Sequence, residues 1–203
     1  MTATLAARNA HLDHAHAQLV TYLGVFPDER RELGALIAQI TDGDADLLLR
    51  GNMRGHITTS GLVCDESVGK VLMIHHRGLD RWLQPGGHHE GTDDLELSAA
   101  REVLEETGMD SLVNHPWHQT NKAPFDVETH RIAASPAKGE GEHWHHDFIY
   151  LFVSASCRPL RPQMAEVKDA RWMELSEFEA LPEGRFARIA RKLRGLPSLR
   201  ASD

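Results

Sequence analysis

Residues Gly87–Met109, with the sequence GHHEGTDDLELSAAREVLEETGM, are the most informative segment of the chain. Residues three and four apart lie on one face of a helix, so Glu102, Glu105 and Glu106 point to the same side if this segment is helical. Gly108 follows them, and glycine is the residue that most often ends a helix. The segment therefore predicts a helix with an acidic face.

This acidic face predicts a divalent cation site. Three carboxylates on one stripe repel each other unless a cation lies among them. Hard cations such as Mg²⁺ prefer oxygen ligands and commonly bridge carboxylates and substrate phosphates. Acidic helix faces are often only solvated, but the glycine pair Gly86 and Gly87 before the helix and the glycine after it favour a functional site.

The stretch resembles the Nudix box, usually written G-x5-E-x7-R-E-U-x-E-E-x-G-U, with U a bulky aliphatic residue. Its positions are filled, in order, by Gly87, Asp93, Arg101, Glu102, Val103, Glu105, Glu106, Gly108 and Met109. Asp93 is the one departure, because it is one methylene shorter than the family's glutamate. We expect it to support the loop, or Glu90, Asp94 or Glu96 to take over, and we expect activity to survive.

The resemblance runs from about His56 to Leu181 and implies an α/β/α sandwich with a mixed sheet. Residues 1–54 read as an N-terminal helical extension and residues 55–203 as the Nudix domain. The extension is expected to be either a cap over the site or a dimerisation element, so a homodimer is one of the expectations.

Hydrophobic periodicity and turn residues predict the individual elements. The expected strands are Ile57–Asp65, Lys70–His75, Leu112–His118, Phe125–Ile132, His145–Ser154 and Asp169–Leu175. The expected helices are one through Leu12–Leu23, one from Pro27 through Ile40, the box helix from Asp93 or Asp94 to Gly108, and two at Ser176–Leu181 and Arg185–Arg194.

Composition excludes several classes of function. The net charge of −8 argues against a nucleic-acid-binding surface, although a bound metal can still attract a phosphorylated small molecule. No apolar stretch is long enough to span a membrane, and no signal peptide is expected at the N-terminus. With 2 cysteines a disulfide framework is not expected. A cytoplasmic protein is the expectation.

The family resemblance implies hydrolysis of a diphosphate bond in a nucleoside diphosphate linked to another group. It also implies that Mg²⁺ or Mn²⁺ is held by Glu102, Glu105, Glu106 and the carbonyl of Gly86. Phosphoryl transfer depends on charge neutralisation and positioning, which suits this ligand set. Arg101 is expected to orient a carboxylate, with Glu105 as the candidate partner.

A further carboxylate extends the expected catalytic set. Nudix enzymes often carry a glutamate in a loop ahead of a strand with a tryptophan, and Glu166 lies six residues before Trp172. Glu166 would bind metal or act as general base. Glu102, Glu105 and Glu106 remain alternatives for the base, and a solvated loop residue is the alternative for Glu166.

The 14 histidines are an unusual feature of the chain. Strand alternation puts His143, His145 and Asp147 on one face, with His130 on the preceding strand as a residue that could lie opposite. Such a set suits a transition metal such as Zn²⁺, a substrate phosphate, or structural hydrogen bonding. His88 follows the double glycine and is expected to contact substrate at the edge of the pocket.

Two other classes of function share this fold. An isopentenyl diphosphate isomerase would need a catalytic cysteine, but neither Cys64 nor Cys157 adjoins the Gly86–Gly87 loop. A non-catalytic nucleotide-binding module usually loses box carboxylates, and this chain keeps them. A metal-dependent diphosphohydrolase acting on a small phosphorylated substrate is therefore the favoured reading.

Overall fold

The computed structural model describes residues 5–89, 94–136, 139–154 and 159–199. Its helices are α1 (Leu5–Val25), the 3-10 helix η1 (Pro27–Arg31), α2 (Gly34–Thr41), α3 (Leu95–Thr107), α4 (Trp117–Asn121), α5 (Leu175–Glu179) and α6 (Gly184–Arg194). Its strands are β1 (Gly55–Asp65), β2 (Lys70–His76), β3 (Arg81–Leu83), β4 (Gly86–His88), β5 (Leu112–Asn114), β6 (Asp126–Ile132), β7 (His143–Ser154) and β8 (Val167–Glu174).

The strands hydrogen-bond into one eight-stranded sheet. Its main order is β3-β2-β1-β7-β5, with β4 on β1, β6 on β7 and β8 on β2. The two strands predicted at Ile57–Asp65 and Lys70–His75 are confirmed as β1 and β2, which pair antiparallel as a hairpin. Its turn is fixed by Asp65, whose carboxylate accepts the backbone N–H groups of Gly69 and Lys70 at 2.8 and 3.0 Å. Asp65 thus sets the register from which the rest of β2 follows.

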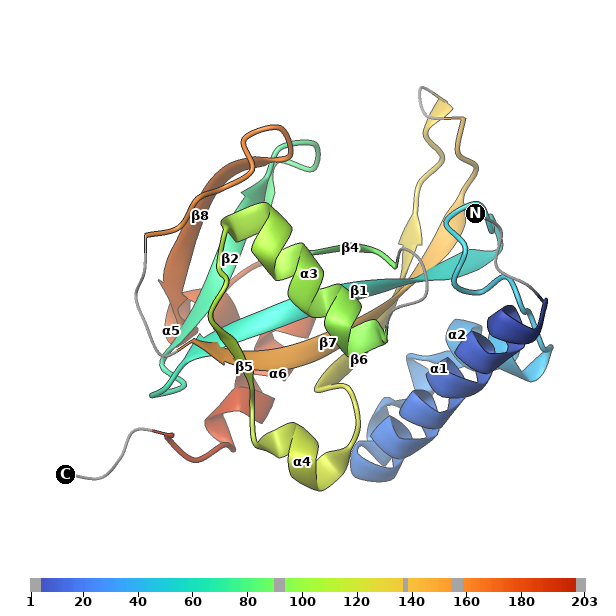
Figure 1. Ribbon diagram of the computed structural model, residues 1–203, viewed down its shortest axis with the longest axis horizontal. Coiled ribbons are helices and arrows are strands. Elements are labelled where there is room, and N and C mark those ends of the chain that lie inside the picture. Colours follow the sequence, from blue (N-terminus) through green and yellow to red (C-terminus); the bar gives the residue numbers. More distant parts are fainter. Residues whose placement is uncertain (1–4, 90–93, 137–138, 155–158, 200–203) are drawn as a thin grey trace. The chain divides into compact units, whose positions relative to one another are not determined.

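The chain folds as two compact units that interleave along the sequence. The first unit consists of Met1–Thr59, Gly87–Ser98 and Pro116–Tyr150, and the second of Ser60–Gly86, Ala99–His115 and Leu151–Asp203. In the first unit α1 packs against η1 and α4 (Figure 1). Among the described residues, no helix has the length and apolar character needed to cross a bilayer.

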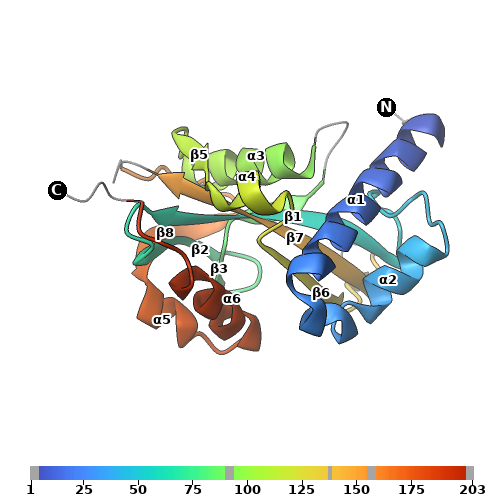
Figure 2. The same ribbon diagram turned by 90° about the horizontal axis from the view of Figure 1, so that it is seen from below.

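In the second unit helices cover both faces of the sheet. The C-terminal part of α3 lies on one face, while α5 and α6 lie together on the other, beneath β2 and β8 (Figure 2). The helix predicted at Arg185–Arg194 is confirmed as α6, and its Phe186, Ile189, Ala190 and Leu193 are fully buried. This layering agrees with the α/β/α arrangement that the sequence predicts.

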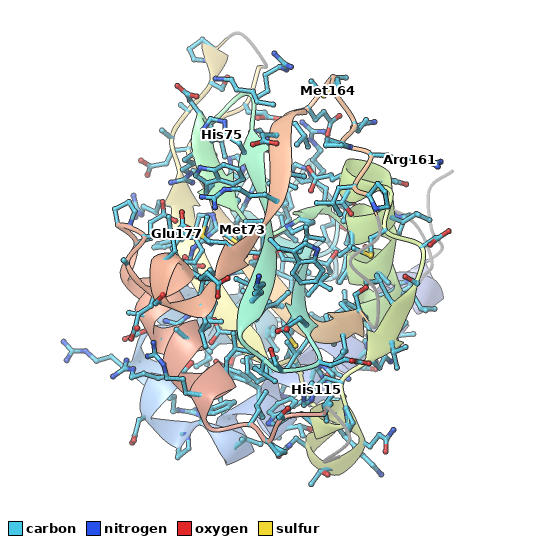
Figure 3. The ribbon with its side chains drawn as sticks, turned by 90° about the vertical axis from the view of Figure 1, so that its left-hand side faces the viewer. Met73, His75, His115, Arg161, Met164 and Glu177 are labelled. Carbon is cyan, nitrogen blue, oxygen red and sulfur yellow. The ribbon has the colours of Figure 1, made fainter. Side chains whose placement is uncertain are left out.

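The ends of α3 are set by its own sequence, as expected. Asp94 acts as the N-terminal cap, because its carboxylate accepts the N–H of Glu96 at 2.8 Å. At the other end Gly108 adopts a φ of +69°, the left-handed conformation that glycine tolerates. The backbone and Cβ of Arg161 pack against Gly108, and Figure 3 shows Arg161 beside this helix.

Two of the sequence predictions were wrong in their extent. The strand expected at Leu112–His118 ends at Asn114, and α4 follows. Pro116 precedes α4, and proline is tolerated at the start of a helix but disfavoured within a strand. The helix expected from Pro27 through Ile40 is divided into η1 and α2, which starts at Gly34, a residue with a low preference for helix interiors.

Strand β1 and helix α3 approach each other closely at Gly61. A Cβ added at Gly61 would lie 2.2 Å from Val103 Cγ2 and 3.2 Å from the carbonyl oxygen of Ala99. The absence of a side chain at Gly61 therefore allows the box helix to lie against β1.

We expect Gly61→Ala to lower the free energy of unfolding by about 1–3 kcal/mol, because the added methyl forces α3 away from β1. Gly184→Ala is the matched control, since nothing lies within 4 Å of a Cβ added there. Urea unfolding of both variants measures the difference. Equal unfolding midpoints for Gly61→Ala and the wild type would show that the helix does not depend on this contact.

Candidate active site

The residues singled out in the sequence form two groups. The carboxylates of the box, Arg101, Gly86 and Glu166 lie in the second unit, and the histidines lie in the first. Each group is described within its own unit.

Glu106 is the most buried carboxylate of the box. It is 3% exposed, and its Oε2 accepts the backbone N–H of Gly86 at 2.9 Å. Burial raises the pKa of Glu106 to about 8, and the negative charges of Glu102, Glu166 and Glu105 add to the rise, although the Gly86 N–H opposes it. A proton or a cation must therefore neutralise this carboxylate at neutral pH.

Arg101 bridges the two other glutamates of the box. Its Nη2 lies 2.9 Å from Glu102 Oε1, and its Nη1 donates to Glu105 Oε2 at 3.0 Å. The expected contact with Glu105 is present, and the guanidinium is shared with Glu102. Arg101 thereby fixes the directions in which two carboxylates point.

The carboxylates share one face of α3 without meeting at one point. Glu102 is buried, whereas the Glu105 side chain is 50% exposed. Among the described residues the carboxylates do not form a group of three whose oxygens all lie within 4.8 Å. Mg²⁺ prefers oxygen ligands and usually keeps several waters beside carboxylates and substrate phosphates, so a spaced, oxygen-only donor set that includes the buried Glu106 fits a hard cation.

Glu166 lies close enough to Glu106 to raise the pKa of that carboxyl group. It occupies an exposed turn just before β8, where its carbonyl accepts the N–H of Arg77 at 2.7 Å. The preceding segment is tied to the end of α3, because Gln163 N–H donates to the carbonyl of Glu106 at 3.2 Å. The downstream carboxylate therefore belongs to the same electrostatic environment as the box.

In the first unit three histidines meet at one point. One ring nitrogen from each of His56, His143 and His145 lies within 4.8 Å of the other two. His143 Nε2 and His145 Nε2 are 3.1 Å apart, and the His56 ring centroid lies 5.0 and 4.7 Å from those of His143 and His145. We call His56, His143 and His145 the histidine cluster.

His56 was missed in the sequence because nothing local distinguishes it. It lies near the start of β1, and only the assembled sheet brings it to the other two residues. His88, which was expected only at the edge of the pocket, lies beside the cluster, with its ring 5.1 Å from that of His56 and 5.3 Å from that of His145. His130 pairs directly with His145 in the β6–β7 register, as anticipated, with ring centroids 5.7 Å apart.

The expected contribution of Asp147 to this cluster was wrong. Asp147 is buried, and its carboxylate accepts a hydrogen bond from Thr58 Oγ1 at 3.2 Å. The group of candidate metal ligands that the described residues form contains His56 in its place. Alternation along β7 groups residues by face, but it does not specify what each side chain meets on the neighbouring strand.

Burial lowers the pKa of three of these histidines, His145, His88 and His56. It lowers the pKa of His145 to about 2 and that of His88 to about 4, and the charges of neighbouring groups add to both shifts. The pKa of His56 is lowered for the same main reason. These imidazoles therefore carry lone pairs at neutral pH and act as weak partners for an anion.

Cys64 and Asp93 bear on the alternative readings. Cys64 is fully buried, and burial raises the pKa of its thiol to about 12, so it is not a thiolate at neutral pH. Cys157 and Asp93 lie outside the described residues. The isomerase reading, which requires a reactive cysteine, gains no support from Cys64.

Comparison with known proteins identifies relatives over most of the chain. The NUDIX domain family matches residues 55–193. Nucleoside diphosphate-linked moiety X motif 6 of Xenopus laevis is 35% identical over 88 residues, which are 42% of this chain and 40% of that protein. This chain thus spans less than half of that relative's length. Phosphatase NudJ of Escherichia coli K12 is 25% identical over 146 residues, 68% of this chain and 81% of NudJ.

Solved structures share the fold. A NUDIX family hydrolase from Clostridium perfringens is 22% identical, with a TM-score of 0.51, covering 70% of this chain and 97% of its own. The E. coli dihydroneopterin triphosphate pyrophosphohydrolase is 16% identical, with a TM-score of 0.51. The match covers 67% of this chain and 92% of that protein. At these identities the likeness concerns the fold, and it confirms the expected α/β architecture. Because the family match covers more than half of the residues, the chain belongs to the NUDIX family of hydrolases.

Proposed function

We propose that the chain hydrolyses the diphosphate bond of a nucleoside diphosphate-linked small molecule, using Mg²⁺ or Mn²⁺ at the acidic face of α3. The observation that carries this proposal is Glu106, a buried carboxylate with a raised pKa that is surrounded by the charges of three further glutamates. Such a group binds a divalent cation in exchange for its proton. The match of residues 55–193 to the NUDIX domain family supports the same assignment.

The proposed ligands are Glu102, Glu105, Glu106 and the carbonyl of Gly86. A bound cation would neutralise the charge of the diphosphate and lower the pKa of a water molecule. The protein's own contribution is positional: Gly86 N–H holds Glu106, and Arg101 holds Glu102 and Glu105. Both contacts are in place before substrate binds, so little reorganisation is needed during the reaction.

Glu166 is the proposed general base. It lies on an exposed turn beside the end of α3, where a water molecule can reach it. Its electrostatic influence on Glu106 supports a position within range of the same reacting group. His88, His143 and His145 were expected to contact substrate. We retain His88 in that role as a proposal, because the Nε2 atoms of His143 and His145 face each other at 3.1 Å.

A substrate screen with Mg²⁺ and Mn²⁺ tests the reaction. It should include nucleoside triphosphates, ADP-ribose, NADH, dinucleoside polyphosphates and nucleotide sugars, with released phosphate and nucleoside monophosphate as the readout. We expect turnover of at least one of these compounds. We also expect Glu105→Gln to lower kcat/KM by roughly 100-fold or more, because it removes a negative ligand.

Glu179→Gln is the matched control for Glu105→Gln. Both residues are glutamates on helices of the second unit, and each pairs with an arginine, Glu179 with Arg194. The control should keep wild-type kcat/KM. Wild-type turnover by both variants would contradict the assignment of the acidic face.

The proposed role of Glu166 predicts that its substitution affects kcat and KM differently. We expect Glu166→Gln to lower kcat by about 10²–10⁴-fold while KM changes little, because a general base acts in the chemical step and not in binding. Steady-state kinetics on the substrate found in the screen measure both constants. A rise in KM at constant kcat would instead show that Glu166 binds substrate.

The raised pKa of Glu106 predicts that the stability of the metal-free protein depends on pH. Its carboxyl pKa rises from 4.5 in the reference state to about 8 in the folded protein. Between these values the unfolded chain holds fewer protons, so the free energy of unfolding falls as pH rises through this window. We expect the thermal midpoint in chelator to fall more between pH 5 and pH 8 for the wild type than for Glu106→Gln. Parallel curves would contradict the raised pKa.

A further inference from the structure

The structure contains a second set of metal-ligand groups, separate in chemistry from the box. His56 near the start of β1 and His143 and His145 at the start of β7 place three ring nitrogens within 4.8 Å of one another. We propose that the histidine cluster binds a Zn²⁺ ion through one nitrogen of each imidazole. Oxygen ligands of the Nudix box take no part in this site.

The hydrogen bonds of the outer ring nitrogens define which nitrogens are available. His56 Nδ1 lies 3.2 Å from the carbonyl oxygen of Asn52, and His143 Nδ1 lies 2.8 Å from that of Gly141. A carbonyl only accepts, so each Nδ1 carries the proton and donates it. In a neutral imidazole the opposite nitrogen, Nε2, is then left with a lone pair. Metal-binding histidines are oriented by this kind of outer contact.

Of the inner nitrogens, that of His56 is unsatisfied among the described residues, whereas those of His143 and His145 contact each other. His56 is 1% exposed, and its buried Nε2 has no hydrogen-bond partner among the described residues. His143 Nε2 faces His145 Nε2 at 3.1 Å. Burying a polar atom without a partner costs free energy, and a single cation at the centre would satisfy all three imidazoles.

The spacing and the ligand type fit zinc. With Zn–N bonds of about 2.0–2.1 Å, two nitrogens at a tetrahedral angle lie roughly 3.4 Å apart. The 3.1 Å separation of His143 and His145 is close to this value, and small side-chain rotations bring His56 in from within 4.8 Å. Imidazole nitrogens suit Zn²⁺, whereas Mg²⁺ selects oxygen. Three protein ligands leave a fourth position for water or a further side chain.

The same cluster is a poor site for an anion. A phosphate group would need N–H donors, but the Nε2 atoms of His56 and His143 offer lone pairs, because their Nδ1 atoms carry the protons. The ligand chemistry of the cluster therefore favours a cation over a phosphate.

Co²⁺ substitution tests the proposal on the full-length protein without a purification tag. The protein is first stripped with chelator and then titrated with Zn²⁺ or Co²⁺. We expect the wild type to bind Zn²⁺ at a site that gives strong visible absorption with Co²⁺, as tetrahedral nitrogen coordination does. Oxygen-only octahedral binding at the box would give weak absorption. We expect His145→Asn to lose the strong absorption and to weaken Zn²⁺ binding by roughly 100-fold or more.

His16→Asn is the matched control, because His16 lies exposed on α1 of the same unit. It should bind both metals as the wild type does. The Glu105→Gln and Glu106→Gln variants should also keep the strong Co²⁺ band, since the proposed site excludes the box. Circular dichroism in chelator checks that His145→Asn is folded. If that variant does not fold, the Co²⁺ spectrum of the wild type tests the proposal by itself.

Three results would overturn the proposal. The first is a wild-type Co²⁺ spectrum with only weak, octahedral bands. The second is equal Zn²⁺ affinity in the wild type and folded His145→Asn. The third is loss of the strong band in the glutamate variants with retention in His145→Asn, which would place the metal at the box.

Discussion

The contact between Gly86 and Glu106 sets the geometry of the acidic face. A buried carboxylate is costly unless hydrogen bonds or a cation compensate it, and the backbone N–H of Gly86 donates to Glu106 Oε2. Glycine is required there because a Cβ on Gly86 would lie 2.2 Å from Ser60 Oγ and 2.9 Å from Ser60 Cα. Gly86 is therefore needed for two reasons: its N–H donates to Glu106, and a side chain at this position would clash with Ser60.

Other features of the second unit serve the same contact. Gly61 lets α3 lie close to β1, and this closeness brings Glu106 to the loop that contains Gly86. At the end of α3, Gly108 turns the chain, and the Thr107 carbonyl accepts the N–H of Arg161 at 2.8 Å. The segment leading to Glu166 is thereby anchored to the helix that carries the box. The single guanidinium of Arg101 pairs with the two carboxylates of Glu102 and Glu105. The acidic face of α3 therefore keeps a net negative charge.

The sequence predicted those features of the structure that residues close together in the chain determine. Helix α3 was anticipated at both ends because Asp94 caps it and Gly108 terminates it through contacts within a few residues. The contact of Arg101 with Glu105 follows from their spacing on a helix in the same way. Pro116 was a local signal too, and giving it more weight would have ended the strand at Asn114.

Contacts between distant segments escaped prediction. His56 joins His143 through the assembly of the sheet, across a separation in sequence that no periodicity encodes. Asp147 was grouped correctly by face, but its partner Thr58 belongs to another strand. The electrostatic link between Glu166 and Glu106 likewise depends on how the segment before β8 folds back on α3. These features require knowledge of register, which a single sequence does not supply.

The two candidate metal sites differ in ligand chemistry, and this difference would direct two different ions to separate sites. Zn²⁺ binds a given ligand set more tightly than Mg²⁺, so geometry and ligand type must supply selectivity. An all-oxygen face with spaced carboxylates gives Zn²⁺ little advantage and suits an ion that exchanges with each substrate. Three clustered imidazole nitrogens suit a resident ion such as Zn²⁺. Separate ligand chemistry would thus let one chain hold a permanent ion and an exchangeable ion without competition.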